Sequence, residues 1–172
     1  MKDLQIVLIS HEHGDHLNIN TIKRLASERP SLRFGCGDFL AKHLTGIRNV
    51  DLYQSGKIYD YGQFKISPIT LYHDTPNFGY RIFKDGKKVL HATDTRTLEG
   101  ISAKGYSLYA LEANYDEERI HDIIREKHAR GEYAHQRGSI NSHLSVQQSQ
   151  NFVLQNAGEN YQFIQLHQSS QL

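Results

Sequence analysis

The most specific pattern in this chain is Leu4-Gln5-Ile6-Val7-Leu8-Ile9-Ser10-His11-Glu12-His13-Gly14-Asp15-His16. Its first part, residues 4–9, is apolar and β-branched, which predicts a buried strand that runs directly into the polar part. His11 and His13 are two residues apart, so both imidazoles point the same way if the backbone is extended. Asp15 and His16 follow at a tight bend that Gly14 permits. This spacing suits two adjacent metal ions better than a single ion.

Predicted strands and helices are mixed along the rest of the chain, and each unusual polar motif directly follows a strand. Helices are predicted over 17–27, 39–44 and 116–128, and Ser145 with Gln148 predicts the start of another, which Gly158 ends. Strands are predicted over 57–61, 64–72, 78–84, 87–93, 108–113 and 161–166, with Asp85-Gly86 as a two-residue hairpin turn. Active-site residues at strand ends are common in layered α/β folds.

The composition is that of one soluble globular domain, which we assign to residues 1–172. The chain has 172 residues, of which 38% are hydrophobic and 23% charged, and its net charge of +1 gives no sign of an obligate polyanion binder. No apolar run reaches the ~20 residues of a membrane helix, and no cleavage site follows the first strand, so we expect a cytoplasmic protein without membrane contact. The single cysteine, Cys36, excludes an internal disulfide and is expected to be a buried apolar residue.

The motif HEHGDH, residues 11–16, has the HxHxDH pattern of the metallo-β-lactamase superfamily of metal-dependent hydrolases, which this chain resembles. Further motifs follow in that family's order: HDTPNFGYRI (73–82), ATDT (92–95), LEANYD (111–116) and SHLS (142–145). Together they resemble the YycJ-type (WalJ-like) nuclease branch over residues 4–168. The resemblance implies an α/β fold, the αββα four-layer sandwich.

The resemblance also implies a metal centre, and the residue types agree with it. It implies one ion held by His11, His13 and His73, a second ion held by Asp15, His16 and His167, and a bridging Asp94. Imidazole and carboxylate ligands suit Zn²⁺ best, and also Mn²⁺ or Fe. Two such ions can share a hydroxide and clamp the attacking and leaving oxygens of a phosphodiester. A free oxygen of Asp15 would orient that hydroxide or take its proton, which would make Asp15 catalytic as well.

Three further residues have predicted roles beside the metal ions. His143 precedes the helix expected from Ser145, and the resemblance makes it a catalytic residue that touches the scissile phosphate without ligating metal; local packing is the alternative. Glu112 and Asn114 match the family as supports of a histidine ligand or of an active-site loop. A purely structural turn is the alternative for both.

A basic stretch lies between the LEANYD and SHLS motifs. It would suit a nucleic-acid backbone and one stacked base, and an ordinary charged helix end and loop is an equal alternative. Its residues are Arg125, Lys127, Arg130, Tyr133 and Arg137. The remaining histidines are assigned to no metal ion: His43, His91, His121, His128 and His135.

Compared with the family, the chain is expected to be shorter at both ends. Its HxHxDH strand begins at about residue 4 without leading strands, and the sequence stops five residues after His167. The sheet edge that those strands would cover is expected to be open, so we expect a homodimer or another partner to cover it. The predicted function is that of a two-metal hydrolase, most simply a phosphodiesterase or nuclease acting on DNA or RNA. The alternatives are hydrolysis of a small substrate, such as a cyclic nucleotide or a thioester, and a metal-binding structural or interaction protein without turnover.

Overall fold

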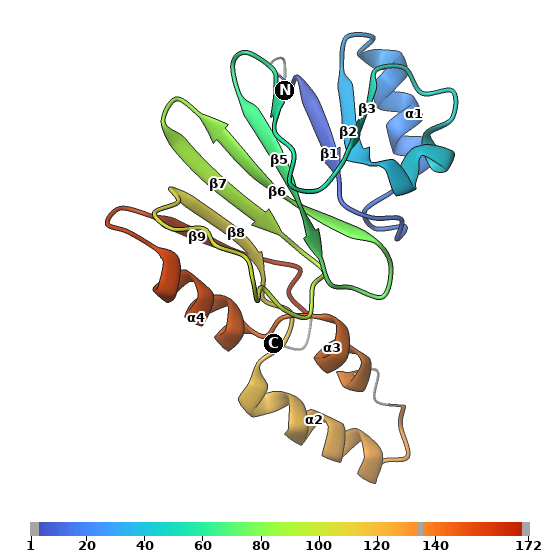
Figure 1. The fold of residues 1–172 in the computed structure, drawn as a ribbon. Helices are drawn as coiled ribbons and strands as arrows, with labels where there is room; N and C mark the ends of the chain where they lie inside the picture. Colours follow the sequence, from blue (N-terminus) through green and yellow to red (C-terminus); the bar gives the residue numbers. More distant parts are fainter. Residues whose placement is uncertain (1–3, 134–135, 170–172) are drawn as a thin grey trace.

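Two β-sheets face each other in the computed structural model, which describes residues 4–133 and 136–169 (Figure 1). The smaller sheet has three parallel strands in chain order: β1 (Ile6–Ile9), β2 (Arg33–Gly37) and β3 (Val50–Tyr53). The larger sheet has six strands, also in chain order: β4 (Tyr59–Asp60), β5 (Lys65–Leu71), β6 (Asn77–Lys84), β7 (Lys87–Ala92), β8 (Leu108–Glu112) and β9 (Gln162–Leu166). Neighbouring strands are antiparallel from β4 to β7 and parallel from β7 to β9.

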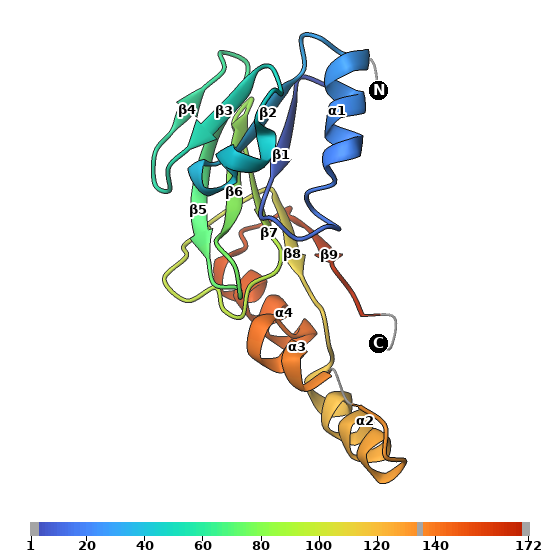
Figure 2. The ribbon, with the colours of Figure 1, turned by 90° about the vertical axis from the view of Figure 1, so that its right-hand side faces the viewer.

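Helices cover the outer faces of both sheets, which gives four layers. Helix α1 (Ile19–Glu28) and the 3₁₀ helix η1 (Asp38–Leu44) pack on the smaller sheet, and α4 (Val146–Asn156) packs on the larger one. Helices α2 (Glu117–Ala129) and α3 (Gln136–Ser142) lie beyond the end of the larger sheet, and α2 points away from the rest of the molecule (Figure 2). The predicted αββα four-layer fold is confirmed. No helix in the described part of the chain is long and apolar enough to cross a membrane.

Three apolar clusters join these layers. The first, around Phe34 and the buried Cys36, joins α1 and η1 to the smaller sheet. The second, around Tyr53 and Tyr80, fills the space between the two sheets where β3 faces β6. The third joins the larger sheet to α4 and includes Leu111 and Val153. Each sheet is therefore fixed on its outer face by a helix, and the two sheets are fixed to each other where β5 and β6 face the smaller sheet.

Two local predictions are confirmed by the backbone geometry. Asp85 and Gly86 both have positive φ, 49° and 74°, as the predicted hairpin turn requires. Ser145 and Gln148 form a reciprocal capping box at the start of α4. The short helix predicted over 39–44 is also present, as the 3₁₀ helix η1. The sequence analysis also missed β2, β3 and α3.

Strand β1 is an edge of the smaller sheet, and β9 is an edge of the larger sheet. Among the described strands, β1 pairs only with β2, and β9 pairs only with β8. The expectation of an open edge at the first strand therefore agrees with the observed topology. That a second chain covers this edge stays a prediction.

Candidate metal centre

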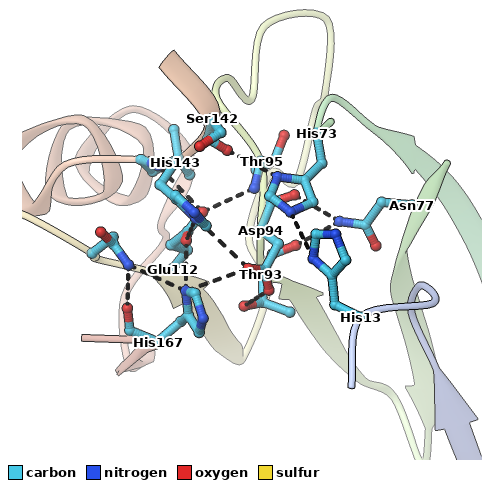
Figure 3. A network of polar contacts seen from close by, with 12 residues as sticks. His13, His73, Asn77, Thr93, Asp94, Thr95, Glu112, Ser142, His143 and His167 are labelled. Atoms are coloured by element: carbon cyan, nitrogen blue, oxygen red, sulfur yellow. Dashed lines mark hydrogen bonds and ion pairs between the residues drawn. The ribbon is translucent and has the colours of Figure 1, made fainter. Parts of the chain in front are cut away.

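Four strand ends converge at one end of the sandwich, and they carry all of the residues predicted as metal ligands. Figure 3 shows four of these ligands, His13, His73, Asp94 and His167. The loop after β1 carries His11, His13, Asp15 and His16, while His73 follows β5, Asp94 follows β7 and His167 follows β9. Strands β5, β7 and β9 run in the same direction, so their carboxyl ends meet at one edge of the larger sheet. The β1 loop approaches that edge from the smaller sheet.

The inner group consists of His11, His13 and His73, and one ring nitrogen of each lies within 4.8 Å of the others. His73 Nε2 is 3.4 Å from His13 Nδ1, and His73 Nδ1 is 3.2 Å from the carbonyl oxygen of Ser142. A carbonyl oxygen only accepts, so Nδ1 of His73 carries the proton and Nε2 keeps its lone pair. That lone pair points toward another imidazole nitrogen, which is the arrangement expected around a shared cation.

His11 is the fully buried member of the inner group. Its Nδ1 is 3.0 Å from Ser10 Oγ, but its Nε2 has no hydrogen-bond partner among the described residues. Buried polar atoms nearly always have a partner, so this nitrogen fits a metal ligand. Burial, together with the nearby His16, lowers the pKa of His11 to about 4. The ring is therefore neutral, as ligation requires.

The outer group consists of Asp15, His16 and His167, whose ligand atoms also lie within 4.8 Å of one another. Asp15 Oδ2 is 3.4 Å from His16 Nε2 and 3.7 Å from His167 Nε2. The Asp15 side chain is 65% exposed, so this group lies at the rim of the sandwich and not inside it. The residues present in both groups thus fit the ligand sets that the sequence predicts for two ions.

Asp94 lies between the two groups. Its carboxylate is 3.1 Å from His16 Nε2 and 3.4 Å from His167 Nδ1, and it also shares a candidate metal cluster with His11. Burial disfavours its charged form, but the hydrogen bond from His16 and the neighbouring His167 outweigh burial and lower the pKa of Asp94. Thr93 Oγ1 donates a further hydrogen bond of 2.8 Å to the same carboxylate. An ionised Asp94 is therefore in position to face both groups, as a bridging ligand must.

The turns that present Asp94 and His167 have left-handed backbone, with φ of 55° and 52°. The side-chain amide of Asn77 donates to the backbone carbonyls of Thr93 and Asp94, at 2.9 Å and 2.7 Å (Figure 3). The amide of Asn114 donates to the carbonyl of His167 at 3.0 Å. Two asparagines thus hold the two turns, and sequence analysis singled out only the second of them.

Glu112 is a fully buried carboxylate behind the outer group. One of its oxygens accepts hydrogen bonds from Nδ1 of His143 at 2.5 Å and from Nδ1 of His167 at 3.0 Å (Figure 3). The other accepts from the backbone N–H groups of Thr95 and Leu144. Burial opposes ionisation, but the hydrogen bonds from the two histidines outweigh it and lower the pKa of Glu112. Because Nδ1 of His167 donates to Glu112, its Nε2 is left for the metal side.

His143 lies beside the predicted ligands, with its Nδ1 3.6 Å from Asp94 Oδ1. The N-terminus of α4 next to it is already occupied. Val146 N–H donates to the Tyr115 carbonyl, and Gln148 N–H donates to Ser145 Oγ. The expected anion site at this helix end therefore has fewer free N–H groups than the sequence suggested, and the His143 side chain is the group that faces the centre.

Glu12 connects the metal-binding loop to two other segments, and the sequence analysis missed this role. Its carboxylate accepts hydrogen bonds from Nε2 of His43, at 3.0 Å, and from Thr75 Oγ1, at 3.2 Å. His43 comes from η1 and Thr75 from the loop after His73, so Glu12 joins the smaller sheet to the β5–β6 connection. Only the position of Glu12 between His11 and His13 could have signalled this.

In the predicted basic stretch, two of the arginines pair with acidic side chains of the same helix. Arg125 pairs with Asp122 and Arg130 pairs with Glu126 along α2, while Tyr133 is 87% exposed. The side chain of Arg137 and the whole of His135 lie outside the described residues. These pairs fit the alternative of an ordinary charged helix end for α2, and the nucleic-acid surface stays a prediction.

Comparisons with known proteins agree with this fold and site. A family model described as "Beta-lactamase superfamily domain" matches residues 1–150. Exodeoxyribonuclease WalJ of Streptococcus pneumoniae is 29% identical over an alignment of 129 positions. The alignment covers 68% of this chain and 47% of the relative, so the chain spans about half of that protein.

Solved structures show the same fold at low identity. The metallo-β-lactamase fold protein YhfI of Bacillus subtilis has a TM-score of 0.72 at 17% identity, covering 98% of this chain and 66% of YhfI. The short form of human tRNase Z has a TM-score of 0.65 at 17% identity, covering 97% of this chain and 73% of tRNase Z. With the family match over residues 1–150, these findings show that the chain belongs to the metallo-β-lactamase superfamily of hydrolases, with a resemblance to its WalJ-like branch.

Proposed function

We propose that this protein is a two-metal phosphodiesterase that acts on DNA or RNA. The observation that carries the proposal is the convergence of two histidine-rich groups on one ionised carboxylate, Asp94. Two divalent ions held in this way would supply an activated hydroxide and would neutralise charge on a phosphodiester. Nitrogen and carboxylate donors favour Zn²⁺, with Mn²⁺ or Fe as alternatives.

The residues of the chain have separate tasks in this proposal. His11, His13 and His73 hold the inner ion, and Asp15, His16 and His167 hold the outer one. Asp15 is the most exposed of them, so one of its oxygens is accessible to orient the attacking group and accept its proton. Because each histidine ligand must be neutral, the hydrogen bonds that fix its tautomer are part of the site.

His143 would contact the scissile phosphate. Its Nδ1 donates to the ionised Glu112, which holds the ring and leaves Nε2 as the nitrogen that would face a phosphate oxygen. Glu112 would therefore act on two histidines at once, His143 toward the substrate and His167 toward the outer ion. A nucleic-acid substrate is supported by the likeness to WalJ, which is named an exodeoxyribonuclease.

A turnover assay on protein with known metal content tests the proposal. Protein purified without chelator is analysed for Zn, Mn and Fe, stripped, and reloaded with each ion separately. It is then given single-stranded and duplex DNA, RNA, a cyclic nucleotide and a thioester. We expect phosphodiester cleavage that depends on reloading and is strongest on a nucleic acid. Cleavage of the thioester alone, or two bound ions without any turnover, would contradict the proposal.

A further inference from the structure

A histidine that ligates a metal ion usually donates its other ring N–H to an oxygen acceptor, which fixes the tautomer and the orientation of the ring. Four of the five predicted histidine ligands contact an oxygen through Nδ1. His11 and His16 lie 3.0 and 3.4 Å from Ser10 Oγ, His73 lies 3.2 Å from the Ser142 carbonyl, and His167 lies 3.0 Å from Glu112. The fifth ligand, His13, contacts a carboxylate that the proposed function does not use, Asp74.

The two ring nitrogens of His13 face different groups. Nδ1 is 3.4 Å from His73 Nε2, and Figure 3 shows these two rings facing each other. Nε2 is 3.4 Å from Asp74 Oδ1. Nδ1 is therefore the atom that faces the shared ion, and the nitrogen that remains lies beside a carboxylate. The His13 side chain is 42% exposed and that of His73 only 3%, so the core holds the His13 ring less firmly.

The same oxygen of Asp74 is 3.1 Å from His73 Nε2. That nitrogen keeps its lone pair, because Nδ1 of His73 carries the proton. A carboxylate oxygen and a lone pair repel each other at this distance, and a cation beside both of them removes the repulsion. The histidines of the inner group are neutral when they ligate. Asp74 therefore places a negative charge beside this group that its three histidines lack.

Asp74 lies in the connection between β5 and β6, which hydrogen bonds fix on both sides of it. Thr75 Oγ1 donates to Glu12 of the metal-binding loop at 3.2 Å, and the backbone N–H of Tyr72 donates to Thr95 Oγ1 at 3.0 Å. The Asp74 side chain itself is 63% exposed and has room to rotate. Its 3.4 Å contact with the imidazole can therefore shorten to ordinary hydrogen-bond length.

We propose that Asp74 is the positioning carboxylate of the inner ion. It accepts the Nε2–H of His13, which leaves Nδ1 as the ligand atom, and it adds negative charge beside the ion. Glu112 has the corresponding place in the outer group, where it accepts from His167. The two carboxylates differ in their surroundings, because Glu112 is fully buried. The outer group that it supports borders a groove of about 550 Å³, which His16 and His167 line. Each half of the centre then has one carboxylate that acts through a histidine.

Metal titration of the full chain tests this inference, which rests on the metal centre of the proposed function but not on its reaction. Zn²⁺ is titrated by calorimetry into wild-type protein, Asp74→Ala and Asp74→Asn, and NMR signals of His73 and His167 show which ion is bound. We expect Asp74→Ala to weaken binding of the inner ion by about 10–100-fold and to leave the outer ion unchanged. Asp74→Asn keeps an oxygen acceptor, so it should restore part of this loss.

The ring proton of His13 gives a second readout, which a general structural role would not change. In wild-type protein with saturating Zn²⁺, we expect the Nε2–H signal of His13 to exchange slowly with water. In Asp74→Ala this signal should disappear, while the Nδ1–H signal of His73, which donates to the Ser142 carbonyl, should persist. Asp122→Ala is the matched control, because it removes a carboxylate that is 61% exposed and lies on α2. It should change neither readout.

Three results would overturn the inference. Unchanged affinity for the inner ion in Asp74→Ala would remove the role of Asp74 and leave the proposed function standing. A weakened inner ion together with a persistent Nε2–H signal of His13 would make Asp74 a ligand and not a positioning residue. Wild-type protein that binds no ion at the inner group would contradict both this inference and the proposed function.

Discussion

The inner group, which consists of His11, His13 and His73, includes a fully buried histidine, whereas the outer group, which consists of Asp15, His16 and His167, includes an exposed carboxylate and lies beside an open groove. The inner group contains a fully buried histidine whose free nitrogen already points into the site. The outer group contains a 65% exposed carboxylate and depends on Glu112 to orient one of its histidines. The inner group is therefore preformed by the core, and the outer group is assembled by hydrogen bonds.

The largest effect should come from Asp94→Ala, which removes the carboxylate that faces both groups. We expect both ions to be lost and turnover to fall below detection, because the two halves no longer share a ligand. Elemental analysis and the turnover assay give the result. Asp122→Ala, which removes an exposed carboxylate on α2, is the control and should change neither. A variant that keeps two ions would show that Asp94 does not bridge them.

His143→Ala should leave metal binding by both groups unchanged and should slow the reaction. We expect two ions to remain and the rate to fall by about 10²–10³-fold, the usual cost of one donor to transition-state charge. Rates are measured at saturating metal, with His121→Ala on α2 as the control. Loss of an ion in this variant would mean that His143 is a ligand.

Glu112→Gln should weaken metal binding by the outer group only. The variant keeps an oxygen for a backbone N–H but loses the charge that holds His143 and His167. We expect the affinity of the outer ion to fall by about 10–100-fold, with the inner ion nearly unchanged. Metal titration monitored by calorimetry measures both affinities. Equal weakening of the two sites would show that Glu112 supports the whole centre and not one side of it.

Mild acid should release the outer ion before the inner one, and this effect should be smaller than those of the substitutions. Hydrogen bonds with Asp94 and Glu112 raise the pKa of His16 and His167, so both rings are protonated at higher pH than an ordinary histidine. An ion must displace these protons as the pH falls, whereas His11, with a pKa of about 4, is still neutral. Between pH 7.5 and 6.5 we expect the outer ion to lose about tenfold in affinity and to leave first. Release of the inner ion first would contradict this order.

Much of the fold could be predicted, because short sequence patterns such as turn and capping residues favour the structure that is observed. The hairpin at Asp85 and the capping box at Ser145 each depend on two or three adjacent residues, and both are present. β2 was missed because its Arg-Phe-Gly-Cys-Gly sequence has a weak strand preference. Its glycines are required by tertiary contacts, since a Cβ at Gly35 would meet the ring of Tyr53 at 2.5 Å. α3 was missed because its Gln-Arg-Gly-Ser-Ile-Asn-Ser sequence has no helical spacing of apolar residues.

The candidate site was predictable in its residues but not in its supporting contacts. Each predicted ligand directly follows a strand or lies in the first motif. Its position in the sequence was therefore enough to identify it as a candidate ligand. The contacts of Asn77 and Glu12 join segments far apart in the sequence, and neither residue type signals such a role. The burial of His11 and the exposure of Asp15 also depend on how the two sheets face each other, which no local pattern specifies.

The left-handed backbone of Asp94 and His167 has a consequence for how this protein can evolve. A residue with a Cβ in that conformation is less stable than glycine by roughly 1–2 kcal/mol, so each turn stores energy at a residue that is also a predicted ligand. The hydrogen bonds from Asn77 and Asn114 stabilise these two strained turns in the folded state. Selection for thermal stability alone would favour glycine at both positions, and would thereby delete the centre. The persistence of aspartate and histidine there would then record selection for chemistry against stability.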